Sequence, residues 1–236
     1  MSDAAFPLLQ VAAVSRRFAD GEVQALQRVS FDACAGETIA LTGPSGCGKS
    51  TLLSLIGLLD QPDEGRITID GNDLARIRRA PAFRARQLGF VFQHHHMVPT
   101  MTLQENIEAP MLALGVPKAA RQQRALELLQ AMDLANRARF LPSHVSGGER
   151  QRAAVARALV NRPRIVLADE PTGSLDSRNG QRVVELLVDH ARQAGALVIV
   201  ATHNAEVAAA LERRIALRDG ERVADSGTAR RELVTR

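Results

Sequence analysis

The sequence predicts an α/β fold in which a mostly parallel sheet carries helices on both faces, with an N-terminal antiparallel β subdomain and an inserted α-helical subdomain. Three observations lead to this prediction. First, apolar strand-like segments alternate with a helical segment over residues 164–168, 178–192 and 196–201. Second, residues 94–161 carry apolar side chains at the three- and four-residue spacing of amphipathic helices. Third, a glycine-rich loop at residues 43–50 joins an apolar strand to a helix.

The first 93 residues are rich in β-type segments. The expected elements are, in order, strands over 8–18, 29–33 and 38–42, a helix over 49–58, and strands over 65–70 and 88–92. Asp20-Gly21 and Asp70-Gly71 are typical of tight turns after the first and fourth of these strands. Strands joined by such turns predict the antiparallel part of the fold.

The middle of the chain changes to a helical period. Residues 102–114 and 118–134 predict two amphipathic helices, and a third begins at Gly147 and stops before Pro163. Strand and helix then alternate again, and Asp219-Gly220 turns a last hairpin. We therefore expect one domain over residues 1–236, in which 1–93 and 162–236 form the catalytic core with its β subdomain and 94–161 form the helical subdomain.

The composition restricts the class of protein. The chain has 236 residues, of which 45% are hydrophobic and 3% aromatic, with no Trp or Tyr, so we expect a large aliphatic core. The formal net charge of +4 is mild and dispersed, unlike the basic stripe of a nucleic-acid-binding protein. Arginines crowd residues 76–86, which indicates either a solvated face or a surface near anionic lipid.

Cysteine usage and hydropathy bear on the compartment. Cys34 and Cys47 do not make a disulfide framework, which favours a reducing, cytosolic setting. The N-terminus lacks the pattern of a signal peptide, and no apolar run approaches the ~20 residues of a membrane helix. We therefore expect a protein that does not span a membrane by itself.

The glycine-rich loop matches the phosphate-binding pattern G-x-x-x-x-G-K-[ST] in full. Its residues are Gly43, Pro44, Ser45, Gly46, Cys47, Gly48, Lys49 and Ser50. Glycines let successive backbone N–H groups and the N-terminus of the following helix point at anionic oxygens. In this pattern Lys49 reaches the β- and γ-phosphates, and the Ser50 hydroxyl binds Mg²⁺. Thr51 is expected to contact the α-phosphate, so the predicted cofactors are ATP and Mg²⁺.

Two carboxylates end the apolar strand at residues 165–169. Asp169 is placed to hold Mg²⁺, directly or through water. Glu170 is the candidate general base for an attacking water, a role worth about 10²–10⁴-fold in rate. The alternative is that Asp169 merely caps the turn into Pro171.

Two further polar residues follow strand-like segments. His203 comes after the apolar segment 197–202, at a carboxyl end where ligands of open α/β sheets gather. It could bond the γ-phosphate and position water, although a lone His at a strand end is usually structural. Gln93 ends the segment 88–92 and could bond Mg²⁺ or the water, and so respond to the γ-phosphate.

Ser146-Gly147-Gly148 opens the third predicted helix of the insertion. A serine hydroxyl and glycine amides at a helix N-terminus form an anion site. The alternative is an ordinary serine N-cap, but two consecutive glycines weaken a first helical turn and so favour a ligand contact. To bind one nucleotide, a subunit needs only one phosphate-binding site. A second such site therefore suggests that two copies of the chain share the ATP.

Together these motifs resemble the ATPase subunit of an ABC transporter. The matching parts are Gly43–Thr51, Gln93, Val145–Arg152, Ile165–Glu170, Ser174-Leu175-Asp176 and His203, in the order of the family and over nearly the whole chain. The resemblance implies the RecA-like core of P-loop NTPases and ATP hydrolysis to ADP and phosphate. It also implies a head-to-tail dimer, in which Ser146-Gly147-Gly148 of one subunit covers the γ-phosphate held by Lys49 of the other and Asp176 lies across the interface. The family stacks an aromatic side chain on adenine, a place that Phe18 fits unless it is a core residue.

A finer resemblance is to the lipoprotein-releasing, macrolide-exporter and cell-division branch of the family. It is carried by Leu88–Gln93, Pro99–Asn106 and Ala168–Asp176. That branch usually has an aromatic-Asn-Leu run after the Gln, whereas this chain has His94-His95-His96-Met97 in the segment that would face the membrane partner. Three adjacent histidines could bind a metal, although neighbours in a loop rarely converge on one ion.

The branch resemblance implies a peripheral ATPase on the cytoplasmic face of the inner membrane. It would work as a homodimer with integral-membrane permease subunits and without nucleic acid. ATP would close the dimer and hydrolysis would release it, powering export or extraction of a substrate. The alternative within the branch is transmembrane signalling without transport. ATPases of DNA or ribosomes usually carry two cassettes or a long coiled coil, and non-catalytic cassettes tend to lose Glu170 or Ser146-Gly147-Gly148.

Overall fold

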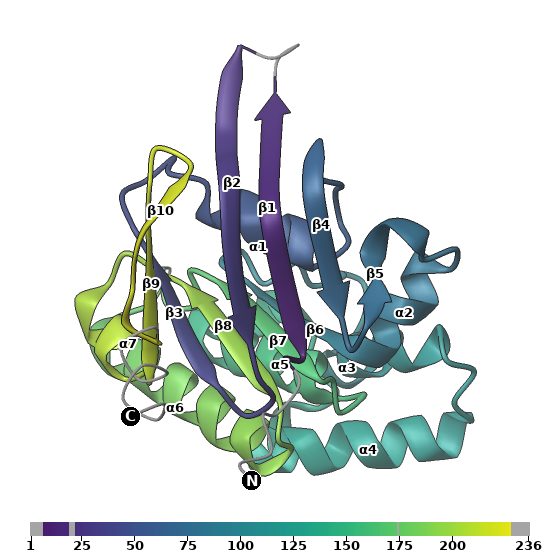
Figure 1. The fold of residues 1–236 in the computed structure, drawn as a ribbon. Helices are drawn as coiled ribbons and strands as arrows, with labels where there is room; N and C mark the ends of the chain where they lie inside the picture. The colour runs from purple at the N-terminus through teal and green to yellow at the C-terminus, as the bar shows by residue number, and fades with distance from the viewer. Residues whose placement is uncertain (1–6, 19–21, 174, 228–236) are drawn as a thin grey trace, which may run out of the picture. The chain divides into compact units, whose positions relative to one another are not determined.

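The computed structural model describes residues 7–18, 22–173 and 175–227 (Figure 1). By their internal contacts these residues form two compact units. The first unit comprises Met1–Arg78 and Leu197–Arg236, and the second comprises Arg79–Ala196. The predicted turn at Asp20-Gly21 and the predicted contact residue Ser174 lie outside the described ranges.

The N-terminal part of the first unit is an antiparallel sheet with the order β2-β1-β4-β5, whose three long strands lie side by side in Figure 1. Its strands are β1 (Leu9–Phe18), β2 (Val23–Ala33), β4 (Glu64–Ile69) and β5 (Asn72–Asp73). Leu9 pairs with Ala33 on one side and Ile69 on the other, and all three side chains are fully buried. This sheet is the antiparallel subdomain that the β-type segments predict.

The rest of the first unit is built on parallel strands. β3 (Thr38–Thr42) lies between β8 (Leu197–Ala201) and β9 (Arg213–Arg218), parallel to both, and β10 (Glu221–Asp225) pairs antiparallel with β9. All five residues of β8 are buried, as expected for a strand covered on both faces. Two helices, α1 (Lys49–Ile56) and α7 (Ala205–Ala209), and the short 3₁₀ helix η2 (Leu74–Arg76) complete the unit.

The second unit combines one parallel strand pair with most of the helices. β6 (Leu88–Phe92) and β7 (Ile165–Asp169) pair so that Phe92 is opposite Asp169. The helices are α2 (Ala80–Gln87), α3 (Leu103–Leu112), α4 (Lys118–Ala131), α5 (Gly147–Leu159) and α6 (Ser177–Gln193), with 3₁₀ turns η3 (Ala135–Arg137) and η4 (Pro142–His144). The three helices predicted between residues 94 and 161 are thus α3, α4 and α5. The α/β class with mostly parallel strands is confirmed.

Asn106 on α3 organises the loop that precedes this helix. Its side chain is buried, with 1% of the residue exposed. The Oδ1 atom accepts a hydrogen bond from Val98 N–H at 2.7 Å, and the Nδ2 atom lies 3.0–3.1 Å from the carbonyl oxygens of Val98, Met101 and Thr102. One amide therefore bonds four backbone groups of the 98–102 loop.

Asn106→Ala is expected to lower the free energy of unfolding by about 1–3 kcal/mol, because Val98 N–H and the Met101 carbonyl lose their hydrogen bonds to the buried Asn106 side chain. Urea unfolding of the intact chain measures the change. Gln123→Ala, which removes an exposed amide from α4, is the matched control and should change stability by less than about 0.5 kcal/mol. Equal stability of the two variants would show that Asn106 does not hold the loop.

Candidate functional site

The phosphate loop follows β3 and leads directly into α1. Lys49 is 7% exposed, and its ammonium donates to the carbonyl oxygens of Gly43 at 2.8 Å and Pro44 at 2.9 Å. Helix α1 begins at Gly48 with no side-chain cap and no acidic residue in its first turn. Its first N–H groups are therefore left to an external anion, as a phosphate site requires.

Three glycines of the loop are required by the backbone. Gly43, Gly46 and Gly48 have φ angles of 146°, 80° and 101°, where L side chains are strained. A Cβ atom at Gly43 would also clash with the carbonyl oxygen of Leu217, and one at Gly48 would clash with that of Ala25. The close approach of β9 and β2 thus sets the path of the loop.

The other loop positions divide between the interior and the surface. Cys47 is buried and Cys34 is half-buried, and the two are not joined by a disulfide bond. Ser50 is exposed and Thr51 half-buried at the start of α1. The Ser50 hydroxyl is thus accessible, as its predicted contact with a metal ion requires.

His203 lies at the carboxyl ends of the parallel strands, as the phosphate loop does. β3 and β8 are parallel neighbours with Leu41 opposite Ala201, so the residues after both strands leave the sheet together. Thr202 is fully buried, its N–H donates to the Leu41 carbonyl at 3.0 Å, and its Oγ1 accepts from Asn204 N–H at 3.0 Å. His203 itself is exposed. The first unit therefore brings the phosphate loop and His203 together.

Phe18, the last residue of β1, is 42% exposed and is not a core residue. The guanidinium carbon of Arg16 lies 5.0 Å from the centre of the Phe18 ring. Arg16 is itself held by Asp60 at 2.9 Å and Asp63 at 2.6 Å. The core alternative is therefore wrong, and an aromatic ring is available upstream of the phosphate loop.

In the second unit, Asp169, Glu170 and Gln93 meet at the carboxyl ends of β7 and β6. Asp169 ends β7 opposite the last residue of β6, and Gln93 follows that residue. Glu170 has a φ of 43°, a left-handed conformation that a non-glycine residue adopts at a cost and that is common at functional sites. A Cβ atom on Gly173 would lie 2.9 Å from the Nε2 atom of Gln93, so the Gln93 side chain packs on the turn that follows Glu170.

Ser146 caps helix α5. Its Oγ accepts from Glu149 N–H at 3.2 Å, its own N–H donates to Glu149 Oε2 at 2.8 Å, and Arg137 holds Glu149 Oε1 at 3.0 Å. The hydrogen bond from Ser146 N–H, helped by Arg137 against the effect of burial, lowers the pKa of Glu149. The serine N-cap considered as the alternative is thus present.

Gly147 and Gly148 are not required by the fold of the second unit. Neither has a positive φ. A Cβ atom would lie 3.7 Å from Leu175 Cδ2 at Gly147 and 3.5 Å from Asn179 Cγ at Gly148, which are ordinary contacts. Packing within the described part of this unit therefore does not explain two consecutive glycines.

Asn179 links Asp176 to the turn at Gly147 and Gly148. The sequence motifs do not identify Asn179 as a site residue. Asp176 caps α6 and accepts from the backbone N–H of Asn179 at 3.0 Å and from its Nδ2 at 2.7 Å. The Asn179 side chain also adjoins Gly148. A sequence signal was available, because Asn179 stands three residues after Asp176, an Asp that precedes the helix predicted at residues 178–192.

Two other expectations concern membranes and metals. Within residues 7–18, 22–173 and 175–227, no helix has the length and hydropathy to cross a bilayer. In the same ranges no three His, Cys, Asp or Glu side chains group as ligands for a metal ion. His95 is half-buried, whereas His94 and His96 are exposed.

Comparison with known proteins places the chain in a family. The profile of the ABC transporter family matches residues 26–173. The macrolide export ATP-binding/permease protein MacB of Brucella melitensis biotype 1 is 44% identical over 233 residues, which cover 97% of this chain and 36% of that protein. The lipoprotein-releasing system ATP-binding protein LolD of Shewanella sp. (strain MR-4) is 42% identical over 217 residues, which cover 90% of this chain and 94% of that protein.

A solved structure agrees with these relatives. It is a dimeric ATP-binding cassette in a post-hydrolysis state with ADP and phosphate, 38% identical to this chain, with a TM-score of 0.85 over 92% of this chain and 97% of that one. The chain spans 35–36% of the length of the MacB relatives that it matches and 94% of the LolD relatives. The phosphate loop, the acidic end of β7, the family profile and the identities of 42–44% show that this chain belongs to the ABC transporter family, as an ATP-binding cassette homologous to LolD and to the ATP-binding part of MacB.

Proposed function

We propose that this chain binds and hydrolyses ATP with Mg²⁺ as a homodimer and powers export or extraction of a substrate through integral-membrane permease subunits. The observation that carries the proposal is the pair of helix starts, each of which could bind an anion. Helix α1 has no side-chain cap, and helix α5 opens on two glycines that its own unit does not require. A homodimer in which each site serves the same nucleotide explains both.

The residues for the chemistry have the required types. Ser50, Asp169 and Gln93 offer a hydroxyl, a carboxylate and an amide oxygen, the hard donors that Mg²⁺ prefers, and the bound ion would neutralise phosphate charge. Lys49 binds the β- and γ-phosphates, and His203 bonds the γ-phosphate. Glu170 takes a proton from the attacking water. The Phe18 ring stacks on adenine, an interaction worth about 1–3 kcal/mol.

In this proposal ATP acts by closing the dimer. Ser146, Gly147 and Gly148 of one protomer cover the γ-phosphate on the other, with Asp176 at the interface, so that loss of this phosphate removes contacts made only in the closed state. To change the dimer from mostly open to mostly closed, ATP must favour the closed form by about 5.5 kcal/mol. The dimeric state of a related cassette with ADP and phosphate supports this arrangement.

The relatives support transport as the outcome. LolD is named for lipoprotein release and MacB for macrolide export, and MacB combines an ATP-binding part with a permease. We propose that this chain acts at the cytoplasmic face of the inner membrane with a separate permease. The segment after Gln93, residues 94–102, carries the change in nucleotide state to that partner.

Gly148→Ala tests the shared nucleotide site. The added methyl group meets ordinary contacts at 3.5 Å within its own unit, so thermal stability and ATP binding by the monomer should remain. ATP-dependent dimerisation, measured by light scattering, and steady-state turnover should each fall by more than about ten-fold, because the backbone at this turn can no longer approach a phosphate. Ser143→Ala, an exposed neighbour, is the control. Normal dimerisation and turnover of Gly148→Ala would refute the proposal.

A further inference from the structure

Helix α5 carries an arginine near its C-terminal end that has no carboxylate partner among the residues that the structure describes. The Arg157 side chain is half-buried, and burial lowers the pKa of its guanidinium. Partial removal of a charge from water is costly unless hydrogen bonds compensate for it. The groups that Arg157 bonds therefore indicate what this charge does.

The guanidinium of Arg157 bonds the backbone of the segment that follows Gln93. It donates to the carbonyl oxygen of His96 at 2.6 Å and to that of His95. The φ angles of His95 and His96 are 60° and 44°. Two successive non-glycine residues with positive φ are strained and persist only when their surroundings support them. Arg157 supplies that support from a helix 61 residues farther along the chain.

The next residues of the segment are held by a second helix. As described above, the Asn106 side chain on α3 bonds the backbone of residues 98–102. Helix α3 packs against α5. Asn161, which follows α5, also donates to the carbonyl oxygen of Pro110 in α3 at 3.2 Å. Residues 95–102 are therefore attached to the α3–α5 pair as well as to strand β6.

Two routes thus lead from the candidate nucleotide-binding residues of the second unit to this segment. One runs through Gln93, whose side chain packs on Gly173 in the turn after Glu170. The other runs along α5. Arg157 is ten residues after Gly147, a distance of about 15 Å along the helix axis. A hydrogen-bonded helix moves as a stiff rod, so a displacement at its first turn also displaces Arg157 and the carbonyl groups that it holds.

We propose that Arg157 is a positioning residue that joins residues 95–96 to α5, so that the segment 94–102 follows movements of the Ser146–Gly148 turn and not only those of Gln93. This inference rests on the proposed function, since it explains how the partner-facing segment responds to the nucleotide. The segment then responds to two nucleotides of the dimer. Gln93 reports the one bound by its own subunit, and α5 reports the one bound by the opposing subunit.

Four variants of the full chain separate this role from general stability. Arg157→Met and Arg157→Leu remove the donors and a charge that is costly to bury, so their thermal midpoints should stay within about 5 °C of the wild type. Arg157→Lys keeps a charged donor, and one ammonium can serve two carbonyl groups, as Lys49 does. Arg124→Met is the matched control, because Arg124 on α4 donates to a different carbonyl group, that of Val160 at 3.4 Å.

Amide hydrogen exchange of the nucleotide-free chain tests the Arg157 contact itself. The N–H groups of His95 and His96 should exchange about ten-fold faster in Arg157→Met and Arg157→Leu than in the wild type, because the strained turn opens more easily. Residues 146–149 should stay within about two-fold, since their capping box is intact. Arg157→Lys and Arg124→Met should resemble the wild type. Unchanged exchange of His95 and His96 in both variants without donors would overturn the inference.

Exchange in the presence of ATP and Mg²⁺ then tests the transmission. In a Glu170→Gln background, ATP should slow the exchange of residues 146–149 and of residues 94–98, each by about three-fold or more. With Arg157→Met added, the response of residues 146–149 should remain and that of residues 94–98 should be lost. Arg157→Lys should keep both responses.

Three results separate the alternatives. A response of residues 94–98 that persists in Arg157→Met would show that Gln93 alone carries it, which would refute the role of Arg157. Loss of both responses together would show that Arg157 supports the unit as a whole and would also contradict a positioning role. Failure of the proposed function would instead appear in the Glu170→Gln reference, as an absence of any ATP response at residues 146–149.

Discussion

Glu170→Gln is expected to lower ATP turnover by about 10²–10⁴-fold while ATP binding persists, because it removes the general base and keeps the shape of the side chain. Glu170 is half-buried and follows the last residue of β7, next to Asp169. Its left-handed φ of 43° tolerates Gln as well as Glu. The substitution should therefore leave the backbone of the site unchanged and remove only the proton acceptor.

The trapped state is the second part of this result. Because ATP stays intact, Glu170→Gln should accumulate as an ATP-dependent dimer, seen by light scattering, under conditions in which the wild type returns to the monomer. Phosphate release measures turnover. Glu185→Gln, which neutralises an exposed carboxylate on α6, is the control and should leave both readings unchanged. Hydrolysis by Glu170→Gln at the wild-type rate would show that Glu170 is not the base.

The parts of the site that could be predicted from the sequence are those in which local chemistry dictates residue type. The phosphate loop needs glycine at Gly43 and Gly48 because the backbone has positive φ and approaches neighbouring carbonyl groups there. β8 is recognisable because a parallel strand buried on both faces is apolar throughout. The ends of such strands then indicate where polar residues such as His203 gather.

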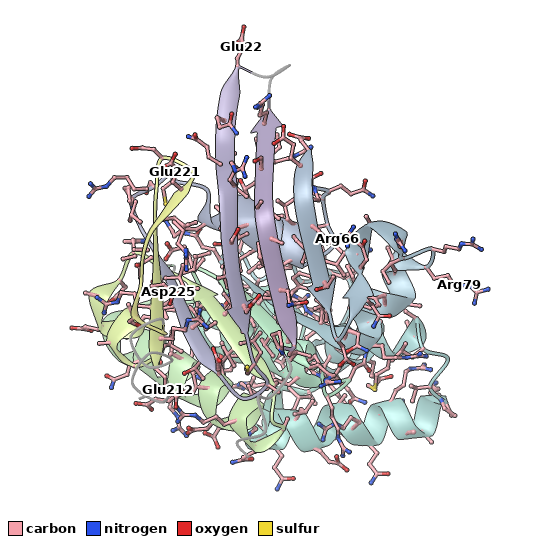
Figure 2. All side chains as sticks on the ribbon, in the orientation of Figure 1. Glu22, Arg66, Arg79, Glu212, Glu221 and Asp225 are labelled. Carbon is pink, nitrogen blue, oxygen red and sulfur yellow. The ribbon has the colours of Figure 1, made fainter. Side chains whose placement is uncertain are left out.

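Other features depend on tertiary contacts and leave little trace in a single sequence. The backbone at His95 is held by Arg157, which donates to its carbonyl oxygen from 62 residues away. From the sequence alone, Phe18 could be assigned to the core or to the surface. Its exposure of 42% in the structure decides between the two. Helix α2 was not predicted because none of its residues is buried, so no apolar period marks it. The arginines around it, among them Arg79 in Figure 2, include several exposed side chains, as a solvated face requires.

Asp225→Asn is expected to destabilise the protein by about 1.5–3 kcal/mol at neutral pH, because it breaks a buried, hydrogen-bonded ion pair and leaves the guanidinium of Arg213 with Glu37 as its charged partner. The Asp225 side chain, labelled on β10 in Figure 2, is 3% exposed and that of Arg213 is 11% exposed. The pair is bidentate, with Arg213 Nε at 2.9 Å and Nη2 at 2.8 Å from the two carboxylate oxygens. Arg213 also bonds Glu37 at 2.9 Å and the carbonyl of Asp32 at 2.7 Å, so it joins three segments of the first unit.

The contribution of Asp225 should depend on pH in a defined direction. Burial opposes ionisation, but hydrogen bonds from Arg213 and Gly227 N–H and the charges of Arg213 and Arg222 outweigh it and lower the pKa of Asp225 below its ordinary value of 3.8. The folded form thus holds its proton less tightly than the unfolded chain. The stabilisation is fully present above that ordinary value and is lost as the pH falls through the folded pKa. Urea unfolding at pH 7, 5 and 3 should show wild type and Asp225→Asn converging at the lowest pH.

The same ion pair bears on nucleotide binding, because the hairpin that it anchors supports the phosphate loop. Gly220 N–H, in the turn between β9 and β10, donates to the Cys47 carbonyl at 3.3 Å, and the Leu217 carbonyl lies against Gly43. Loosening of the hairpin should therefore weaken ATP binding as well as lower stability. Arg222→Met is the control. The Arg222 side chain is 33% exposed, so its ion pair with Asp225 should contribute less than about 1 kcal/mol. If Asp225→Asn and Arg222→Met proved equally stable at pH 7, Arg213 and Asp225 would not form the anchor of this hairpin.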